Sequence, residues 1–277
     1  MKTLFISDLD GTLLDPKGEL TAFAADSLNR LIAQGVNFTF ATARSVYSAE
    51  PLMSGVDIRV PCLLMNGVSV YDLDKSSYIR NCCIDPEASR KVLDAFERHG
   101  VHCFMYRIDG GVLTCYYSAL TTAVMRSFAE SRKKQYKKPF VQCDRLADAA
   151  DEHTVYITTT GPYDDLLPVK LEIEGISGVS CAFYLDVYNG AWYLEIFSDR
   201  ASKANGIRFL REKYGFERVV AFGDNLNDLS MFEAADVRIA VGNAREELKS
   251  AADLVIGDNR NDGVVRWLTD NSGKYTE

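Results

Sequence analysis

The sequence lacks the features of a membrane-spanning or secreted protein. Its apolar runs are short and interrupted by charged residues, and none has the length that spans a bilayer. The N-terminus has no basic stretch followed by a long apolar region and a small-residue cleavage site. The seven cysteines are an odd number without a C-x-x-C pair, a pattern typical of reduced thiols. We therefore expect a cytoplasmic protein with no membrane partner.

Positive charge is also scarce. Lys and Arg number 31 against 39 Asp and Glu, and the resulting net charge of -8 argues against nonspecific binding to nucleic acid. The one basic cluster, residues 132–138, is interpreted as a solvated helix end. The three histidines lie far in sequence from every motif described below, and we assign them no catalytic role.

The order of apolar patterns predicts an α/β fold. A length of 277 residues favours two domains. A helix is expected near 21–34, and the strands of the first part are expected near 2–8, 36–41 and 62–65. After residue 190 the alternation of strand and helix resumes, with strands near 192–197, 218–223, 237–241 and 253–256. Such alternation is typical of a doubly wound parallel sheet, a Rossmann-like core.

The middle of the chain has a different pattern. Between residues 84 and 187, hairpins are mixed with helices, which predicts an antiparallel sheet covered on one face. We therefore expect a core domain formed by 1–83 and 188–277 and an inserted α+β cap domain formed by 84–187. Because two strands would join the cap to the core, the cap could hinge over the strand ends and exclude water.

The most informative motif is at the start of the chain. The first predicted strand leads into Asp8 and Asp10, two carboxylates one residue apart, followed by a Gly-Thr turn. On an extended backbone these side chains start on the same side, at the strand end where parallel sheets build their sites. Two such carboxylates repel unless a cation or a proton intervenes, so one could be a nucleophile and the other an acid. The alternative is a polar turn that ends a buried strand.

Three later segments each place a polar group after a strand or at a helix start. Thr42 follows the second strand and could bind phosphate or cap a helix. Lys203 is in the first turn of a predicted helix, where a cation is disfavoured unless it faces an anion or is simply exposed. Asp224, Asn227 and Asp228 follow another strand and suit a hard cation such as Mg²⁺, or a turn that caps the next helix.

Taken in order, the four segments resemble the four motifs of the haloacid dehalogenase superfamily of phosphohydrolases. The array is most similar to the Cof-type branch, which has a large cap inserted between the second and third motifs. Shorter matches at 64–67, 193–196, 239–244 and 261–264 extend the resemblance over nearly the whole chain. One departure is Ala43, where relatives usually have glycine, because a methyl group could crowd a bound phosphate.

The resemblance implies a role for each motif residue. Asp8 would be the nucleophile that forms an aspartyl-phosphate, and Asp10 would protonate the leaving oxygen and then activate water. Mg²⁺ would be held by Asp8, Asp224 and the main-chain carbonyl of Asp10, with Asp228 supporting these ligands. The expected phosphate-binding residues are Thr42, Lys203 and Asn227, the last either on phosphate or on Lys203. Weaker candidates for contacting the substrate or the cap are Arg44 and Asn66.

The expected function is hydrolysis of a small phosphorylated metabolite, foremost a sugar phosphate. A sugar phosphomutase and a regulatory or binding protein that retains the site are the alternatives. Asp262 is interpreted as the N-cap of the last helix, without a catalytic role. Aromatic side chains in and beside the cap could stack on a substrate ring or could belong to the core, namely Tyr106, Tyr116, Tyr184, Tyr188 and Trp192. The sequence predicts no oligomeric state.

Overall fold

The computed structural model describes residues 1–185 and 190–276, and Tyr188 therefore lies outside the described residues. The chain divides into two compact units. The first, the parallel-sheet unit, comprises residues 1–80 and 202–277, and the second, the inserted unit, comprises residues 81–201.

The parallel-sheet unit is built on five strands in the order β14-β13-β12-β1-β2. Each neighbouring pair is parallel. The strands are β1 (Thr3–Ser7), β2 (Asn37–Phe40), β12 (Arg218–Gly223), β13 (Val237–Ala240) and β14 (Leu254–Val255). Because β1 lies between β2 and β12, the residues that follow these strands meet at one edge of the sheet.

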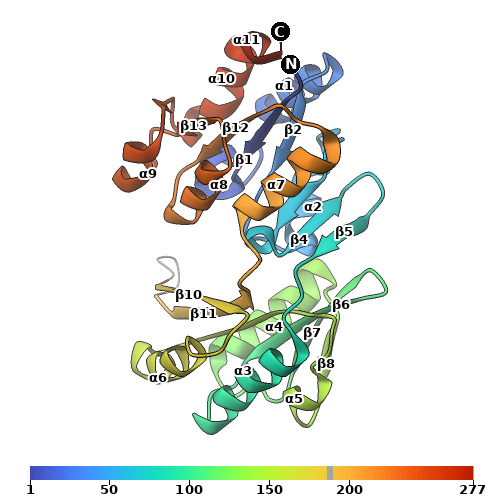
Figure 1. Cartoon of the computed structure of the whole chain (residues 1–277), viewed down its shortest axis with the longest axis vertical. Helices are drawn as coiled ribbons and strands as arrows, with labels where there is room; N and C mark the ends of the chain where they lie inside the picture. Colours follow the sequence, from blue (N-terminus) through green and yellow to red (C-terminus); the bar gives the residue numbers. More distant parts are fainter. Residues whose placement is uncertain (186–189, 277) are drawn as a thin grey trace. The chain divides into compact units, whose positions relative to one another are not determined.

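Helices cover both faces of this sheet (Figure 1). α1 packs against α10, and α7 packs against α8. The helices of the unit are α1 (Ala22–Ala33), α2 (Val46–Met53), α7 (Lys203–Tyr214), α8 (Leu229–Glu233), α9 (Glu246–Ala251), α10 (Gly263–Asn271) and α11 (Gly273–Thr276). Aromatic strand residues, including Phe5, Phe38 and Phe222, are fully buried in the core. The predicted doubly wound α/β core is thus confirmed.

A three-stranded sheet, in the order β3-β4-β5, completes the unit. Its strands are β3 (Cys62–Leu64), β4 (Ser69–Asp72) and β5 (Ser77–Asn81). We expected β3 in the parallel sheet, but it joins that sheet only through a single parallel bridge between Ala41 and Leu63. Its ladder is formed with the antiparallel β4, because the chain turns back immediately after Leu64.

The inserted unit has a six-stranded sheet in the order β10-β11-β9-β6-β7-β8. All neighbouring pairs are antiparallel except β7 and β8. The strands are β6 (Phe104–Asp109), β7 (Val112–Tyr117), β8 (Phe140–Gln142), β9 (Thr154–Gly161), β10 (Val179–Leu185) and β11 (Trp192–Ser198). The helices are α3 (Pro86–Arg98), α4 (Ala123–Tyr136), α5 (Leu146–Ala149) and α6 (Tyr163–Ile173).

The two faces of this sheet have different environments. On the first face, Met105, Ile157 and Ile196 belong to an apolar core shared with residues of α3, α5 and α6. On the second face, α4 packs Phe128 against Phe104 of β6, with ring centroids 5.2 Å apart. The expected α+β inserted domain is confirmed, with an unequal distribution of helices over its sheet.

The position of β11 corrects the predicted domain boundaries. We expected residues 192–197 to return to the core sheet, with boundaries after residues 83 and 187. Instead β11 pairs antiparallel with β10 and β9, and the division falls after residues 80 and 201. The reason is that Leu194 and Ile196 contribute to the apolar core of the inserted unit. The structure also adds α2, β8 and α5, which are too short or too irregular for the pattern to predict.

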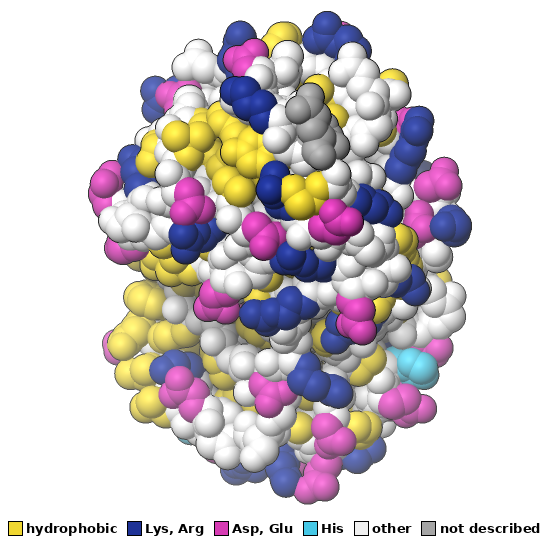
Figure 2. Space-filling view, turned by 45° about the horizontal axis from the view of Figure 1, so that its top comes forward, with side chains coloured by type: hydrophobic (Ala, Val, Ile, Leu, Met, Phe, Trp, Pro, Cys, Tyr) yellow, Lys and Arg dark blue, Asp and Glu magenta, His cyan; other side chains and the backbone are white. Residues whose placement is uncertain are grey.

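None of the described helices has the length and apolar character needed to cross a membrane. On the face drawn in Figure 2, Lys and Arg side chains are interspersed with Asp and Glu side chains rather than gathered in one basic stripe.

Candidate active site

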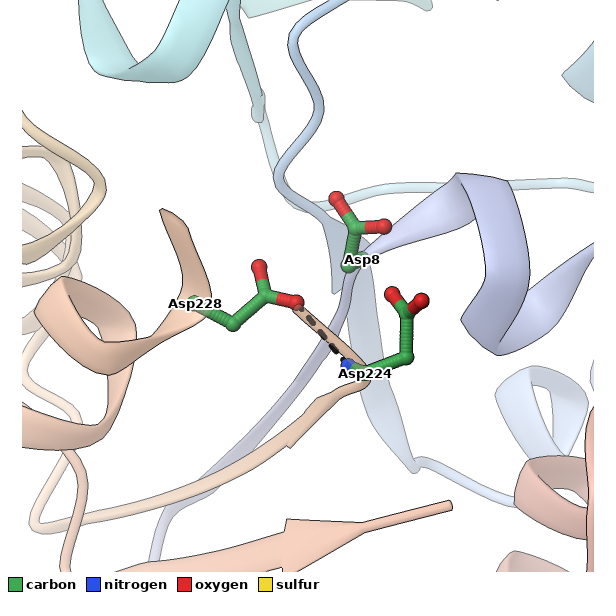
Figure 3. Close-up of side chains that lie close together, drawn as sticks. All are labelled: Asp8, Asp224 and Asp228. Atoms are coloured by element: carbon green, nitrogen blue, oxygen red, sulfur yellow. Dashed lines mark hydrogen bonds between the residues drawn. The ribbon is translucent and has the colours of Figure 1, made fainter. Parts of the chain in front are cut away.

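Three aspartates converge at the edge of the parallel sheet (Figure 3). Asp8 directly follows β1 and Asp224 directly follows β12, and the Asp8 amide donates to the carbonyl of Phe222 at 2.9 Å. Asp228 comes from the helical turn after β12. One carboxylate oxygen of each residue lies within 4.8 Å of the others. The neighbouring strands therefore bring Asp8 and Asp224 together, as the sequence predicts.

Lys203 is buried between two of these carboxylates. Its Nζ lies 2.5 Å from Oδ1 of Asp8 and 2.7 Å from Oδ1 of Asp228. The exposed fractions are 1% for Lys203, 5% for Asp8 and 0% for Asp228. Lys203 is the first residue of α7, where Ser202 caps the helix by accepting from the amide of Asn205 at 3.0 Å. A cation at this unfavourable helix position is thus directed at anions, one of the two alternatives that the sequence left open.

Asp228 organises the loop that carries Asp224. Its Oδ2 accepts from the amides of Asp224 at 3.0 Å and Asn225 at 3.1 Å. The missing side chain of Gly223 lets Asp228 lie this close to the loop, because a Cβ on Gly223 would lie 2.6 Å from the Cβ of Asp228. Lys203 is therefore held by Asp8 and Asp228 and not by Asn227, which was one of the two roles that we expected for Asn227.

The Gly-Thr pair after Asp10 serves Asp224. Thr12 donates its hydroxyl to Oδ1 of Asp224 at 3.0 Å. Gly11 has a φ of +79°, and a Cβ there would lie 2.4 Å from Oδ2 of Asp224. Asn243 in turn donates to the Gly11 carbonyl at 2.7 Å. The first and fourth motifs are thus fixed to each other by hydrogen bonds and by close packing.

The site carries more negative than positive charge. Burial raises the pKa of Asp8, and Asp228 and Asp224 raise it further, although Lys203 opposes them. Burial and Asp228 raise the pKa of Asp224 to about 6. Burial alone would lower the pKa of Lys203, but Asp228 and Asp8 outweigh it and raise that pKa. Three carboxylates against one ammonium favour a further cation, and a donor set made only of oxygens suits a hard ion such as Mg²⁺.

Asp10 lies apart from the three carboxylates. Its side chain is 51% exposed and accepts two bonds from Arg44, with Nε to Oδ2 at 2.8 Å and Nη2 to Oδ1 at 2.6 Å. This bidentate geometry is that of an ionised carboxylate. Arg44, expected to contact the substrate or the cap, is thus a partner of Asp10 in this structure.

Thr42 is buried, and its Oγ1 accepts from the amide of Arg44 at 3.1 Å. It does not cap a helix, since α2 begins only at Val46. Ala43 is exposed and is absent from the residues with a positive φ, so its methyl group causes no backbone strain. Asn227 donates to the side chain of Asn66 at 3.4 Å, so the two expected substrate-side residues contact each other.

Sequence reasoning missed the strained turn that links these motifs. Met65, Asn66 and Gly67 all have a positive φ, of 50°, 55° and 90°. The amides of Met65 and Asn66 donate to the carbonyls of Arg44 and Thr42 at 3.0 and 2.9 Å. A Cβ on Gly67 would lie 2.1 Å from the carbonyl of Ser202, next to Lys203. The Asn-Gly pair was the available signal, and it lies in the turn between the antiparallel strands β3 and β4.

Asp262 occupies the N-cap position of α10 without acting as a side-chain cap. It has a φ of +53°, and its Oδ1 instead accepts from the hydroxyl of Thr21 at 2.7 Å. The predicted N-cap position is therefore confirmed, although the Asp262 side chain makes no capping bond.

Residues 5–268 match the haloacid dehalogenase-like hydrolases. The chain belongs to this family. It is 27% identical to the pyridoxal phosphate phosphatase YbhA of Escherichia coli over 94% of this chain and 95% of the relative. It is 26% identical to the 5-amino-6-(5-phospho-D-ribitylamino)uracil phosphatase YwtE of Bacillus subtilis over 99% of this chain and 100% of the relative. A crystal structure of a Thermotoga maritima protein aligns with this structure with a TM-score of 0.79 and 28% identity, over 98% of this chain and 97% of the other.

These matches confirm the predicted family, its Cof-type branch and a hydrolase of the phosphatase class. They cover both units, so they extend over the inserted domain as well as the parallel sheet.

Proposed function

We propose that this haloacid dehalogenase-like hydrolase is an Mg²⁺-dependent phosphatase that acts on a small phosphorylated metabolite through an aspartyl-phosphate on Asp8. The observation that carries the proposal is the convergence of Asp8, Asp224 and Asp228 around the buried Lys203. A structural ion pair needs no surplus of carboxylates, whereas phosphoryl transfer needs both a nucleophilic oxygen and charges that neutralise the phosphoryl group.

Asp8 is suited to be the nucleophile. Its position directly after β1 is fixed by the backbone bond to Phe222, and Lys203 holds one of its oxygens. The other oxygen is then available to attack phosphorus. Lys203 also lowers the repulsion between an anionic Asp8 and an incoming phosphate, and Thr42 and Asn227 are the further phosphate-binding candidates.

Asp10 would act as acid and then as base. The leaving oxygen needs a proton when the ester bond breaks, and water must lose one when it attacks the aspartyl-phosphate. Each Asp10 oxygen accepts one bond from Arg44, and the second acceptor position on each oxygen can take up the proton. Arg44 and Asn66 remain candidates for contacting the substrate.

The residues present fit a magnesium ion. Asp8 and Asp224, with the main-chain carbonyl of Asp10, would hold it, while Asp228 keeps Lys203 and the loop amides in place. When bound, Mg²⁺ supplies positive charge that offsets the repulsion between carboxylate and phosphate.

The substrate class is open to a direct screen. The sequence predicts a sugar phosphate, while the two relatives above are named for phosphate esters that contain a nitrogen heterocycle. A phosphomutase or a non-catalytic binding protein stays the alternative, as cytoplasmic localisation stays a prediction. A phosphomutase would convert one sugar phosphate isomer into another without releasing free phosphate.

The test is release of inorganic phosphate from a panel of phosphorylated metabolites, with Mg²⁺ and after chelation. We expect turnover that requires the metal and that Asp8→Asn abolishes, because an amide cannot supply the anionic nucleophile. Asp26→Asn, on the exposed side of α1, is the matched control and should retain full activity. Normal turnover by Asp8→Asn, or full activity without a divalent ion, would contradict the proposal.

A further inference from the structure

The loop between β13 and α9 contacts both segments that carry the proposed metal ligands. This loop comprises residues 241–245 of the parallel-sheet unit. The amide of Arg245 donates to the carbonyl of Asp224 at 2.8 Å. The side chain of Asn243 donates to the carbonyl of Gly11 at 2.7 Å. One loop therefore holds the backbone of the first motif as well as that of the fourth.

The side-chain amide of Asn243 is bonded at both ends. Its Nδ2 donates to Gly11, and its Oδ1 accepts from the backbone amide of Asn259 at 3.0 Å. Asn259 lies in the segment after β14 and is 6% exposed, and its own side chain donates to the carbonyl of Leu14 at 2.9 Å. Because a side-chain amide has its acceptor and its donors on opposite sides, these bonds fix the orientation of Asn243. The two side chains together form a clamp on residues 11–14, the asparagine clamp.

The clamped turn carries the main-chain carbonyl of Asp10, one of the proposed metal ligands. Asp10 has a φ of -71° and a ψ of 122°, and Gly11 has a φ of 79° and a ψ of -8°, close to the angles of a type II turn. The positive φ favours glycine at this position, but glycine also has the greatest backbone freedom of any residue. The turn therefore needs a bond from outside to hold one position, and Asn243 supplies it at the Gly11 carbonyl.

The same turn is in close contact with Asp224. A Cβ on Gly11 would lie 2.4 Å from Oδ2 of Asp224, so this carboxylate rests against the Gly11 backbone. The backbone of Asp224 is in turn held by Arg245. Because Asn243 and Arg245 belong to one loop, that loop sets the spacing between the Asp10 carbonyl and the Asp224 carboxylate. Mg²⁺ demands near-ideal octahedral geometry, so this spacing affects how tightly the metal binds.

We propose that Asn243 and Asn259 are positioning residues that hold the Asp10 carbonyl at the spacing from Asp224 that Mg²⁺ requires. This inference rests on the proposed Mg²⁺-dependent phosphatase function and adds to it two residues that act through the backbone of the turn. Loss of the clamp should weaken metal binding more than folding. The physical reason is that a few hydrogen bonds are lost while a glycine turn beside a metal ligand is released.

The test is calorimetric titration of Mg²⁺ into the metal-free full chain without substrate. Asn243→Ala removes both bonds of this side chain and should raise the Kd for Mg²⁺ by about 10- to 100-fold, the range for residues that orient metal ligands. Asn259→Ala removes only the bond to Leu14 and should raise the Kd by a smaller factor, about 3- to 10-fold. Asn243→Gln keeps the donor and the acceptor on a longer, exposed side chain, so it should raise the Kd less than Asn243→Ala.

Asn29→Ala is the matched control. Asn29 of α1 also donates its side-chain amide to a backbone carbonyl, that of Gly55 at 2.9 Å, and accepts from a backbone amide, that of Asp57 at 2.8 Å. The control therefore removes the same two kinds of bond in the same unit, away from the clamped turn. Asn29→Ala and Asn243→Ala should both lower the midpoint of thermal unfolding of the metal-free chain, by about 2–10 °C, whereas only Asn243→Ala should weaken Mg²⁺ binding.

An unchanged Kd for Mg²⁺ in Asn243→Ala would overturn the proposal, and so would an equal rise in Asn29→Ala. If Asn243→Ala does not fold, Asn243→Gln and Asn259→Ala decide in its place. An unchanged Kd in both of these variants would then overturn the proposal, and a raised Kd would support it.

Phosphate release by the same variants separates this inference from the proposed function. A raised Kd in Asn243→Ala supports the clamp even if the unmodified chain hydrolyses no phosphate ester, and absent hydrolysis would then contradict the phosphatase proposal alone. Mg²⁺-dependent hydrolysis with an unchanged Kd in Asn243→Ala supports the phosphatase proposal and overturns the clamp. No binding of Mg²⁺ to the unmodified chain would overturn both.

Discussion

Replacing Lys203 with methionine is expected to destabilise the parallel-sheet unit strongly. Methionine fills a similar volume but leaves Asp8 and Asp228 buried without their cation. Removing one partner of a buried ion pair costs about 3–5 kcal/mol, because the remaining charge is not compensated. For a unit of this size, each kcal/mol lowers the midpoint of thermal unfolding by about 2–4 °C, so we expect a fall of roughly 6–20 °C at neutral pH.

The assay has to report on the unit that contains Lys203. Trp267 lies in that unit, with its ring 5.4 Å from Phe222, whereas Trp192 lies in the inserted unit. In a Trp192→Phe background, tryptophan fluorescence therefore follows the parallel-sheet unit alone. Urea and thermal unfolding would be measured with a chelator present, and Lys213→Met, an exposed lysine on the same helix, is the control expected to change stability by less than about 0.5 kcal/mol.

Adding Mg²⁺ extends the test. Lys203→Met leaves three carboxylates with no cation of the chain, so the metal should stabilise this variant more than the unmodified protein. A loss of less than about 1 kcal/mol in Lys203→Met would refute the view that Lys203 compensates the buried charge. No stabilisation of either protein by Mg²⁺ would refute the view that the cluster binds the metal.

Three further predictions concern the same site. Burial raises the pKa of Asp224 from 3.8 to about 6, so the folded state holds the proton more tightly than the unfolded state. The free energy of unfolding of the metal-free protein should therefore fall by about 2–3 kcal/mol as pH rises from 4 to 7. In urea unfolding Asp224→Asn should show a smaller fall, and an equal fall in both proteins would contradict the prediction. Thr12→Val removes the hydrogen bond to Asp224 and should raise the Mg²⁺ concentration for half-maximal activity by about 10- to 100-fold. Thr12→Ser keeps the hydroxyl and should show the unmodified protein's metal dependence. Unchanged metal dependence in Thr12→Val would count against a role of Thr12 in orienting Asp224. Gly223→Ala places a Cβ against Asp228 and should lower the free energy of unfolding in urea by about 1–3 kcal/mol. Gly257→Ala is the control, because the nearest atom to its Cβ would lie at an ordinary 3.6 Å. Equal losses in the two variants would show that the close approach of Asp228 to Gly223 is unimportant.

The convergence of Asp8 and Asp224 was predictable because it needs only two facts. Each residue follows an apolar strand, and the carboxyl ends of neighbouring parallel strands share one edge. The burial of Lys203 was less predictable, since a lysine at a helix start can equally be exposed. Its burial depends on Gly67, whose missing side chain lets the turn approach Ser202. Contacts between segments so far apart in sequence leave no periodic signal.

The error over β11 has a physical cause. Residues 192–198 alternate between the two faces of a sheet, and that alternation is the same whether the neighbours are parallel or antiparallel. What decides is the partner, and β11 pairs along its whole length with β10, which immediately precedes it in sequence. The turn at Met65–Gly67 escaped prediction for a related reason, because propensity does not anticipate a methionine with a positive φ.

The burial of Lys203 bears on how its variants should be interpreted. Asp8 and Asp228 could not be buried together beside the half-buried Asp224 in a metal-free chain unless a cation of the chain compensated them, and Lys203 meets that requirement. The same ammonium is also placed to meet a phosphate oxygen, so loss of activity in a Lys203 variant cannot by itself be assigned to catalysis. Stability and turnover must be measured on the same variant under the same metal concentration. Only a loss of turnover that persists after Mg²⁺ has restored the fold would assign Lys203 a part in phosphoryl transfer.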